Sequence, residues 1–134
     1  MKVINAVGKR KTAIARATVK DGKGIITING TPLKLYQPEI ARLKIEEPII
    51  ISSPLSQKLD IEIEVRGGGV FGQADAARQA VARGIVQHSE SAEIKQKFLA
   101  YDRNLLIYDS RRTEVRKPSR SSQGARRRRQ LSKR

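Results

Sequence analysis

The chain has 134 residues, a net charge of +15, and 38% hydrophobic but only 4% aromatic residues, which predicts one small domain with an aliphatic core. It contains no cysteine, which excludes disulfide bonds and cysteine-ligated zinc, and no apolar run approaches the roughly 18 residues of a membrane span. Because the first residues alternate in polarity instead of forming the apolar block of a signal peptide, we expect a soluble, cytoplasmic protein.

The first part of the chain predicts three β-strands. Residues 3–7 are short and apolar, and residues 12–20 alternate strictly between small apolar side chains and larger or polar ones. The segment KDGKG, residues 20–24, predicts a hairpin turn that returns the chain as a strand over residues 25–28. Asn29-Gly30 predicts a second turn directly after it.

The middle of the chain predicts a helix followed by a strand. Pro38-Glu39 is typical of a first helical turn, and we expect Ile40 and Leu43 to face the core. Residues 48–57 fit either a short helix or a buried extended segment, and we favour the helix. Residues 60–66 give the clearest strand, because Ile, Ile and Val alternate with glutamates.

Two helices are predicted next. The longer one runs from Gly72 to His88, and one stripe of it carries mostly small residues that would let it lie close to a sheet: Ala74, Ala77, Val81, Gly84, Ile85 and His88. Ser89 or Ser91 caps a second helix that ends near Ala100. Residues 104–109 fit a last strand or an extended crossing. This order of elements predicts an α+β fold with one sheet and helices packed on one face.

A glycine-rich loop joins the clearest strand to the longest helix. It contains Gly67-x-Gly69-x-x-Gly72, but the preceding strand alternates with acids and no βαβ unit follows, so a dinucleotide cofactor is not favoured. A helix N-terminus with open backbone can still hold a nucleic-acid phosphate. We assign this role to Arg66, Gly67, Gly68, Gly69, Gly72, Gln73, Arg78 and Arg83. The alternative is that the glycines serve only tight packing.

A basic turn lies between the first two predicted strands. Lys9, Arg10 and Lys11 are consecutive, and Arg16 projects from the second strand. A turn of this kind can bind a backbone phosphate. Solvated surface charge without a binding role would give the same run of basic residues.

The C-terminal segment is the strongest functional signal. Residues 111–134 hold eleven Lys and Arg against one acid, a net charge of +10. Such a segment cannot bury enough apolar surface to order itself, so we expect a globular domain over residues 1–110 and an extended tail, disordered when free, that folds on RNA. Its predicted RNA contacts are Arg111, Arg112, Arg116, Lys117, Arg120, Arg126, Arg127, Arg128 and Arg129.

Enzyme chemistry finds little support in the sequence. His88 is the only histidine and lies on the apolar stripe of its helix, and Glu62 and Glu64 fit the solvated face of a strand. We therefore expect no catalytic activity, no metal and no cofactor.

Three long motifs resemble one known family. GKRKTAIARATV near the start, VRGGGVFGQADAARQAVARGIV in the middle and DSRRTEVRKPSRSSQGARRRRQLSKR at the end are similar to ribosomal protein nine of the small subunit. The resemblance covers residues 3–134, and KIEEPI at residues 44–49 is more similar to the archaeal and eukaryotic branch than to the bacterial one.

This resemblance implies more than the patterns do. It implies the α+β fold shared with the second domain of another small-subunit protein, including a left-handed βαβ crossover. It places the chain in the head of the small subunit, on ribosomal RNA and beside neighbouring head proteins. It also implies that Lys133 and Arg134, at the tip of the tail, approach the tRNA in the peptidyl site. Many relatives carry an aromatic residue where this chain has Leu131, so no stacking role carries over to that position.

Two other classes of function fit parts of the sequence. A nucleic-acid compaction or chaperone protein would share the basic tail. A small phosphotransferase would use the glycine loop, but Asp75 is the only acid close to that loop.

Overall fold

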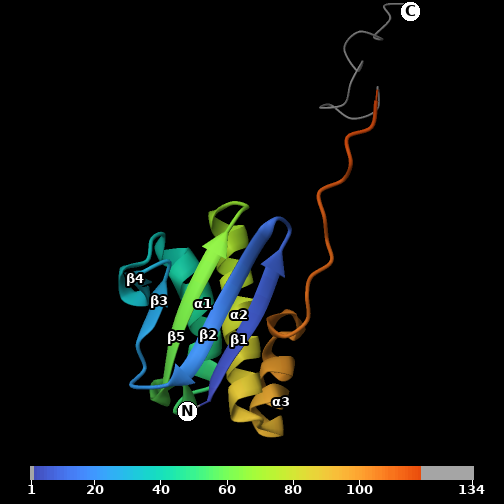
Figure 1. Ribbon diagram of the computed structural model, residues 1–134. Helices are drawn as coiled ribbons and strands as arrows, with labels where there is room; N and C mark the ends of the chain where they lie inside the picture. Colours follow the sequence, from blue (N-terminus) through green and yellow to red (C-terminus); the bar gives the residue numbers. More distant parts are fainter. Residues whose placement is uncertain (1, 119–134) are drawn as a thin grey trace, which may run out of the picture.

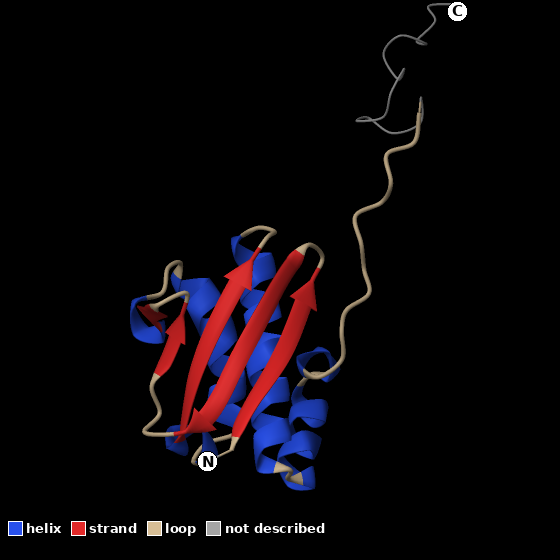
Figure 2. Cartoon of the chain, in the orientation of Figure 1, coloured by secondary structure: helices blue, strands red, loops and turns tan. Residues whose placement is uncertain are grey.

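One mixed sheet with helices on one face makes up the fold. The computed structural model describes residues 2–118, and Figures 1 and 2 show the sheet in front of the helices. The five strands lie in the order β1-β2-β5-β3-β4. The elements are β1 (Val3–Arg10), β2 (Ala13–Asp21), β3 (Ile26–Ile28), β4 (Thr31–Pro32), α1 (Glu39–Ile51), β5 (Leu59–Arg66), α2 (Val70–Ser89) and α3 (Ala92–Tyr101), with 3-10 turns at Leu33–Leu35, Leu55–Lys58 and Arg103–Leu105. The predicted α+β class is confirmed.

The long strands bury the side chains that the alternation predicted. Ala13, Ala15, Ala17 and Val19 of β2 are fully buried, and β5 buries Leu59, Ile61, Ile63 and Val65 on the same face. The opposite face of these strands carries no helix (Figure 2). The core therefore lies between the sheet and the helices, and small side chains on β2 keep it thin.

The predicted hairpin between the second and third strands is wrong. β2 pairs along its length with β5, from Ile14 opposite Arg66 to Asp21 opposite Leu59, and β3 lies on the far side of β5. β5 offers β2 eight paired positions, whereas β3 has only three residues. Asp60 of β5 also holds the turn segment, because its Oδ1 accepts hydrogen bonds from the backbone N–H groups of Lys23 (2.9 Å) and Ile25 (3.1 Å).

The second predicted turn is confirmed. Asn29 and Gly30 both have positive φ, +50° and +84°, and join β3 to β4 in a two-residue hairpin.

The crossover from β3 to β5 is left-handed. These two strands are parallel. In Figure 2 the chain runs up β3, passes behind the sheet through α1, and re-enters as β5 to the right of β3. About 98% of such crossovers have the opposite hand, so the handedness implied by the resemblance is confirmed against the general rule.

The inward face of α1 differs from the prediction. Ile40 and Leu43 are 62% and 49% exposed, whereas Ala41, Ile45 and Pro48 are buried. Pro48 does not end the helix, which continues to Ile51; only Leu55–Lys58 forms a separate 3-10 turn. α1 packs against α2, and its buried face carries Ala41 and Ile45 in place of Ile40 and Leu43.

α2 lies very close to the sheet, as its small residues predicted. A Cβ placed on Gly84 would lie 2.6 Å from Cγ2 of Val19 on β2. A Cβ placed on Gly8 of β1 would lie 2.1 Å from the carbonyl oxygen of Ala76. The helix begins at Val70, two residues before the prediction. It also buries Ala76, Gln79, Ala80 and Ala82, because β1 as well as α1 and α3 pack against it.

The edge of β1 is closed by side chains. The N–H of Lys9 donates to Oε1 of Gln79 (2.8 Å), and Arg83 donates to the carbonyl oxygen of Val7 (3.1 Å). Residues 104–109 form neither the strand nor the extended crossing that the sequence predicted. Asn104 and Leu105 belong to the 3-10 turn Arg103–Leu105, a turn and a bend follow, and Asp109 makes a single parallel bridge to Arg10. Ser91 caps α3, with its Oγ 3.5 Å from the N–H of Ile94. Within residues 2–118, no helix is long and apolar enough to cross a membrane.

Candidate nucleic-acid interface

The basic turn between β1 and β2 presents two of its three cations to solvent. Lys9 and Lys11 are exposed, as is Arg16 farther along β2, and none of them forms an ion pair within residues 2–118. Lys11 occupies the tip of the turn with a φ of +53°. The middle cation, Arg10, is turned inward. The turn therefore offers free ammonium groups on a fixed backbone.

The glycine loop lies beside this turn, because β2 and β5 are neighbours and Arg66 pairs with Ile14. Gly67 and Gly68 have φ values of +78° and +68°, and a Cβ on Gly67 would lie 2.6 Å from the carbonyl oxygen of Thr12. These two glycines are therefore required for the local structure, as the packing alternative expected. Gly69 has no atom within 4 Å of an added Cβ, and a Cβ on Gly72 would make only ordinary contacts at 3.9 Å.

The start of α2 is open to an anion. Gly69 is its N-cap, no side chain caps it, and its first turn contains no acid. The amide of Gln73 instead donates to the carbonyl oxygen of Gly67 (3.1 Å), which holds the loop. Free N–H groups at a helix N-terminus favour negative charge. The topology does not provide a dinucleotide site, since α2 is followed by α3 and not by a parallel strand.

Two predicted contact residues on α2 are used inside the protein. Arg78 is 14% exposed and pairs with Glu47 (2.6 Å) and Asp102 (3.1 Å). Arg83 donates to the carbonyl oxygens of Leu106 (2.9 Å) and Val7 (3.1 Å). Both guanidinium groups hold elements together. Two carboxylates neutralise the charge of Arg78, whereas Arg83 donates to neutral carbonyl oxygens and keeps its charge.

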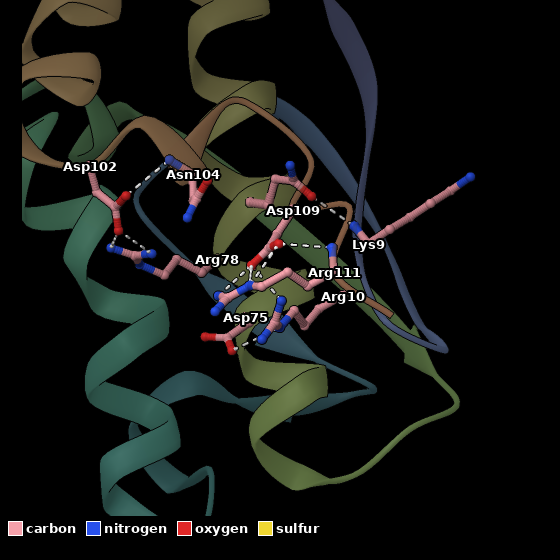
Figure 3. A pocket seen from close by; sticks show the side chains of 9 residues that line it. Lys9, Arg10, Asp75, Arg78, Asp102, Asn104, Asp109 and Arg111 are labelled. Atoms are coloured by element: carbon pink, nitrogen blue, oxygen red, sulfur yellow. Dashed lines mark hydrogen bonds and ion pairs between the residues drawn. The ribbon is translucent and has the colours of Figure 1, made fainter. Parts of the chain in front are cut away.

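Asp109 connects the start of the tail to the basic turn (Figure 3). Its Oδ2 accepts from Nη1 of Arg10, and its carboxylate accepts from the backbone N–H (3.0 Å) and the guanidinium (2.7 Å) of Arg111. The Arg111 hydrogen bonds, reinforced by the charge of Arg10, lower the pKa of Asp109 to about 2. Arg112 donates to the carbonyl oxygen of Lys11 and lies 5.6 Å from the ring of Tyr108. We call residues 108–112 the tail root.

The tail root was not recognised from the sequence. The available signal was Asp109, an acid two residues before the first tail arginine, which is suited to a local pair with Arg111. Its pairing with Arg10, 99 residues away, could not be read from spacing. The polar hollow around it, about 170 Å³, also contains Asp75, Arg78 and Asp102, so its charges are largely balanced internally.

Four predicted tail contacts lie in the described part of the chain. Arg111, Arg112, Arg116 and Lys117 are exposed, and residues 110–117 have no regular secondary structure. Figure 1 shows this segment leading away from the sheet and helices. The remaining predicted contacts lie outside the described residues: Arg120, Arg126, Arg127, Arg128, Arg129, Lys133 and Arg134, together with Leu131 and the expected disorder of the free tail.

His88 occupies a mostly buried position beside Asp21 of β2. Its side chain is 11% exposed, and Nε2 lies 3.2 Å from Oδ1 of Asp21. Within residues 2–118 no group of three or more His, Asp or Glu side chains could hold a metal ion.

Comparison with known proteins agrees with the resemblance of the three motifs. Small ribosomal subunit protein uS9 of Methanococcus maripaludis strain C7 is 50% identical over 132 residues, which are 98% of both chains. The protein of the same name from Methanococcus vannielii is 48% identical over the same share. These archaeal relatives agree with the branch indicated by residues 44–49. The model of the family described as Ribosomal protein S9/S16 matches residues 8–134. The chain therefore belongs to the ribosomal protein S9/S16 family.

Proposed function

We propose that this chain is a structural constituent of the small ribosomal subunit in the cytoplasm, where it binds ribosomal RNA in the subunit head beside neighbouring head proteins. One observation carries the proposal. The basic turn, the glycine loop and the tail root meet at one end of the sheet (Figure 1), and the bond from Arg112 to Lys11 joins residues 101 apart in sequence. Membership of a family of ribosomal proteins supports the same assignment and excludes an enzyme.

The RNA contacts of the domain follow from which cations are free. Lys9, Lys11, Arg16 and Arg66 are exposed, so they can reach phosphates without breaking internal ion pairs. The open start of α2 adds backbone donors. Such contacts read the RNA backbone and fix the orientation of the protein, but they do not identify bases. Arg10, Arg78 and Arg83 support this surface from within.

The tail extends the interface. Residues 111–134 form a separate segment from the 1–110 domain, disordered when free and ordered by RNA, with its tip at Lys133 and Arg134 against the tRNA of the peptidyl site. A terminal arginine can pair with a phosphate through two N–H groups and does not depend on base identity. That property suits a site that must hold every tRNA alike.

Sedimentation of the tagged full-length chain from cell extract, with and without ribonuclease, tests the assignment. We expect co-migration with the small subunit that is lost when RNA is digested. Migration as a light species, or with DNA, would instead support the compaction protein.

Paired substitutions test the surface. Replacing Lys9 and Lys11 with alanine should reduce the salt dependence of RNA binding by about 1.4 in the log–log slope, taking the single-strand value of about 0.7 per phosphate contact. Replacing Lys95 and Lys97 of α3 removes the same charge away from the turn and serves as the control. Equal slopes for the two variants would mean that the turn contributes only general charge.

A further inference from the structure

An exposed aromatic ring stands at the start of α2. Phe71 is 49% exposed, whereas the only other phenylalanine, Phe98, is fully buried. Val70 beside it is 48% exposed. Aromatic residues are scarce in this chain, at 4%, and this one contributes little to the core. The ring lies at the end of the sheet that carries the basic turn, and this position suggests a binding role.

The ring borders a hollow with a positive rim. This hollow, about 360 Å³, lies between the basic turn and the first turn of α2, and Lys11, Gly68 and Phe71 are among its lining residues. Its one acid, Asp75, is paired with Lys44 (3.3 Å) and lies 4.0 Å from Arg10. The neutralised acid leaves a surface that favours an anionic ligand with an apolar part.

The two sides of the ring differ. The ammonium of Lys44 lies 5.6 Å from the ring centroid, a cation–π distance, so the ring is held by a cation on one side. The exposure of the ring leaves a flat apolar area facing solvent. The glycine backbone alongside has no side chain that would block a close approach, since an added Cβ on Gly69 meets nothing within 4 Å.

We propose that Phe71 stacks on an unpaired nucleobase of RNA, while the start of α2 and Lys11 hold the phosphate of the same nucleotide. A nucleotide combines a flat π-face with an adjacent negative charge, which matches the ring and its rim. An apolar protein side chain would cover the ring but would leave the surrounding cations without a partner. This inference rests on the proposed binding of ribosomal RNA, and it adds a base contact to an interface otherwise made of backbone contacts.

Chemical probing of intact small subunits tests the proposal. Subunits carrying the full-length chain as wild type, Phe71→Leu or Phe71→Trp are treated with base-modifying reagents, and RNA reactivity is read by primer extension. Phe71→Leu keeps the bulk of the side chain but removes its π-face. We expect at least a threefold rise in reactivity of one unpaired base in Phe71→Leu, with wild-type reactivity in Phe71→Trp. Tyr101→Leu removes an exposed aromatic ring from α3, outside the lining of this hollow; it is the matched control and should change no base.

Ultraviolet crosslinking provides a second measurement. Trypsin releases residues 67–78 as one peptide, since Arg66 precedes it and Arg78 ends it. A nucleotide adduct on Phe71 in this peptide would support the stacking contact. Unchanged base reactivity in Phe71→Leu subunits with normal protein content, or a crosslink from Phe71 to a protein, would overturn the proposal and leave the ribosomal function standing. Failure of the wild-type chain to enter subunits would refute the function itself.

Discussion

Gly8 provides a strict test of the packing between β1 and α2. A Cβ added there lies 2.1 Å from the carbonyl oxygen of Ala76 and 2.6 Å from the backbone nitrogen of Ala80. Both neighbours are helix backbone and not flexible side chains, so Gly8→Ala must move β1 and α2 apart by roughly 1 Å, which forfeits up to about half of the dispersion energy at that contact. Gly8 does not have positive φ, so its backbone conformation suits alanine.

The two opposing effects can be compared in size. Alanine is favoured over glycine within a strand by about 0.5–1 kcal/mol. Overpacking costs about 1–3 kcal/mol, and backbone neighbours place this site at the upper end. We therefore expect Gly8→Ala to lower the free energy of unfolding by about 2 kcal/mol, which corresponds to a fall in Tm of about 8 °C at roughly 4 °C per kcal/mol.

Urea unfolding of the full-length chain, followed by far-ultraviolet circular dichroism, measures this change. Gly72→Ala is the matched control, because its Cβ would make only ordinary contacts at 3.9 Å and alanine is favoured over glycine within a helix. Its stability should not fall below that of wild type. If Gly8→Ala unfolds at the wild-type urea concentration or above, strand propensity outweighs packing and the close approach of α2 is not limiting.

Three further predictions concern the tail and its root. Asp109→Asn should lower the urea midpoint at pH 7. Because the folded pKa of Asp109 is about 2, below its ordinary 3.8, its contribution to stability is complete above about pH 4 and is lost as the pH falls to 2. A midpoint difference that persisted below pH 2 would contradict this account. Deleting residues 131–134 should leave the chain in the subunit but weaken retention of peptidyl-site tRNA, and filter binding that gave equal tRNA occupancy would refute the role of the tip. Deleting residues 111–134 should remove most of the salt-dependent affinity for RNA. The upper limit on the change in the log–log salt slope is set by up to eleven phosphate contacts at about 0.7 each. An unchanged slope would place the binding in the domain alone.

The tail root fixes the direction in which the tail leaves the domain. Arg10, which the sequence grouped with its solvent-exposed neighbours, pairs with Asp109, and Arg112 bonds to the carbonyl oxygen of Lys11. The basic turn and the first tail arginines are thereby joined before any RNA is bound. Sequence patterns could not reveal this contact, because a charge run shows which residues are basic and not which of them are paired.

The periodicity of the sequence predicted the strands and helices well, but it predicted poorly which of them lie next to one another. The alternation in residues 60–66 identified β5, and the small residues of α2 indicated its close approach to the sheet. The same reasoning paired the second strand with the third, because a turn signal lay between them. The longer ladder between β2 and β5, and the hydrogen bonds that Asp60 accepts from the turn segment, decided otherwise. The exposed Ile40 and Leu43 were misjudged for a similar reason: packing with distant segments buried Ala41 and Ile45 of α1 instead.

The sequence alone was enough for features that depend on local patterns or on summed charge. These are the α+β class, the strand faces, the long helix, the basic tail and, through three motifs, the family. Local patterns suffice there because side-chain alternation, capping and net charge depend on residues close together in the chain. The left-handed crossover came from the family resemblance and not from any local pattern. Only the tertiary structure decided the strand order, the inward roles of Arg10, Arg78 and Arg83, and the link from Asp109 to the basic turn. Each of these depends on which distant segments offer the longest ladder, the closest packing or a counter-charge, and those partners are brought together only when the whole chain folds.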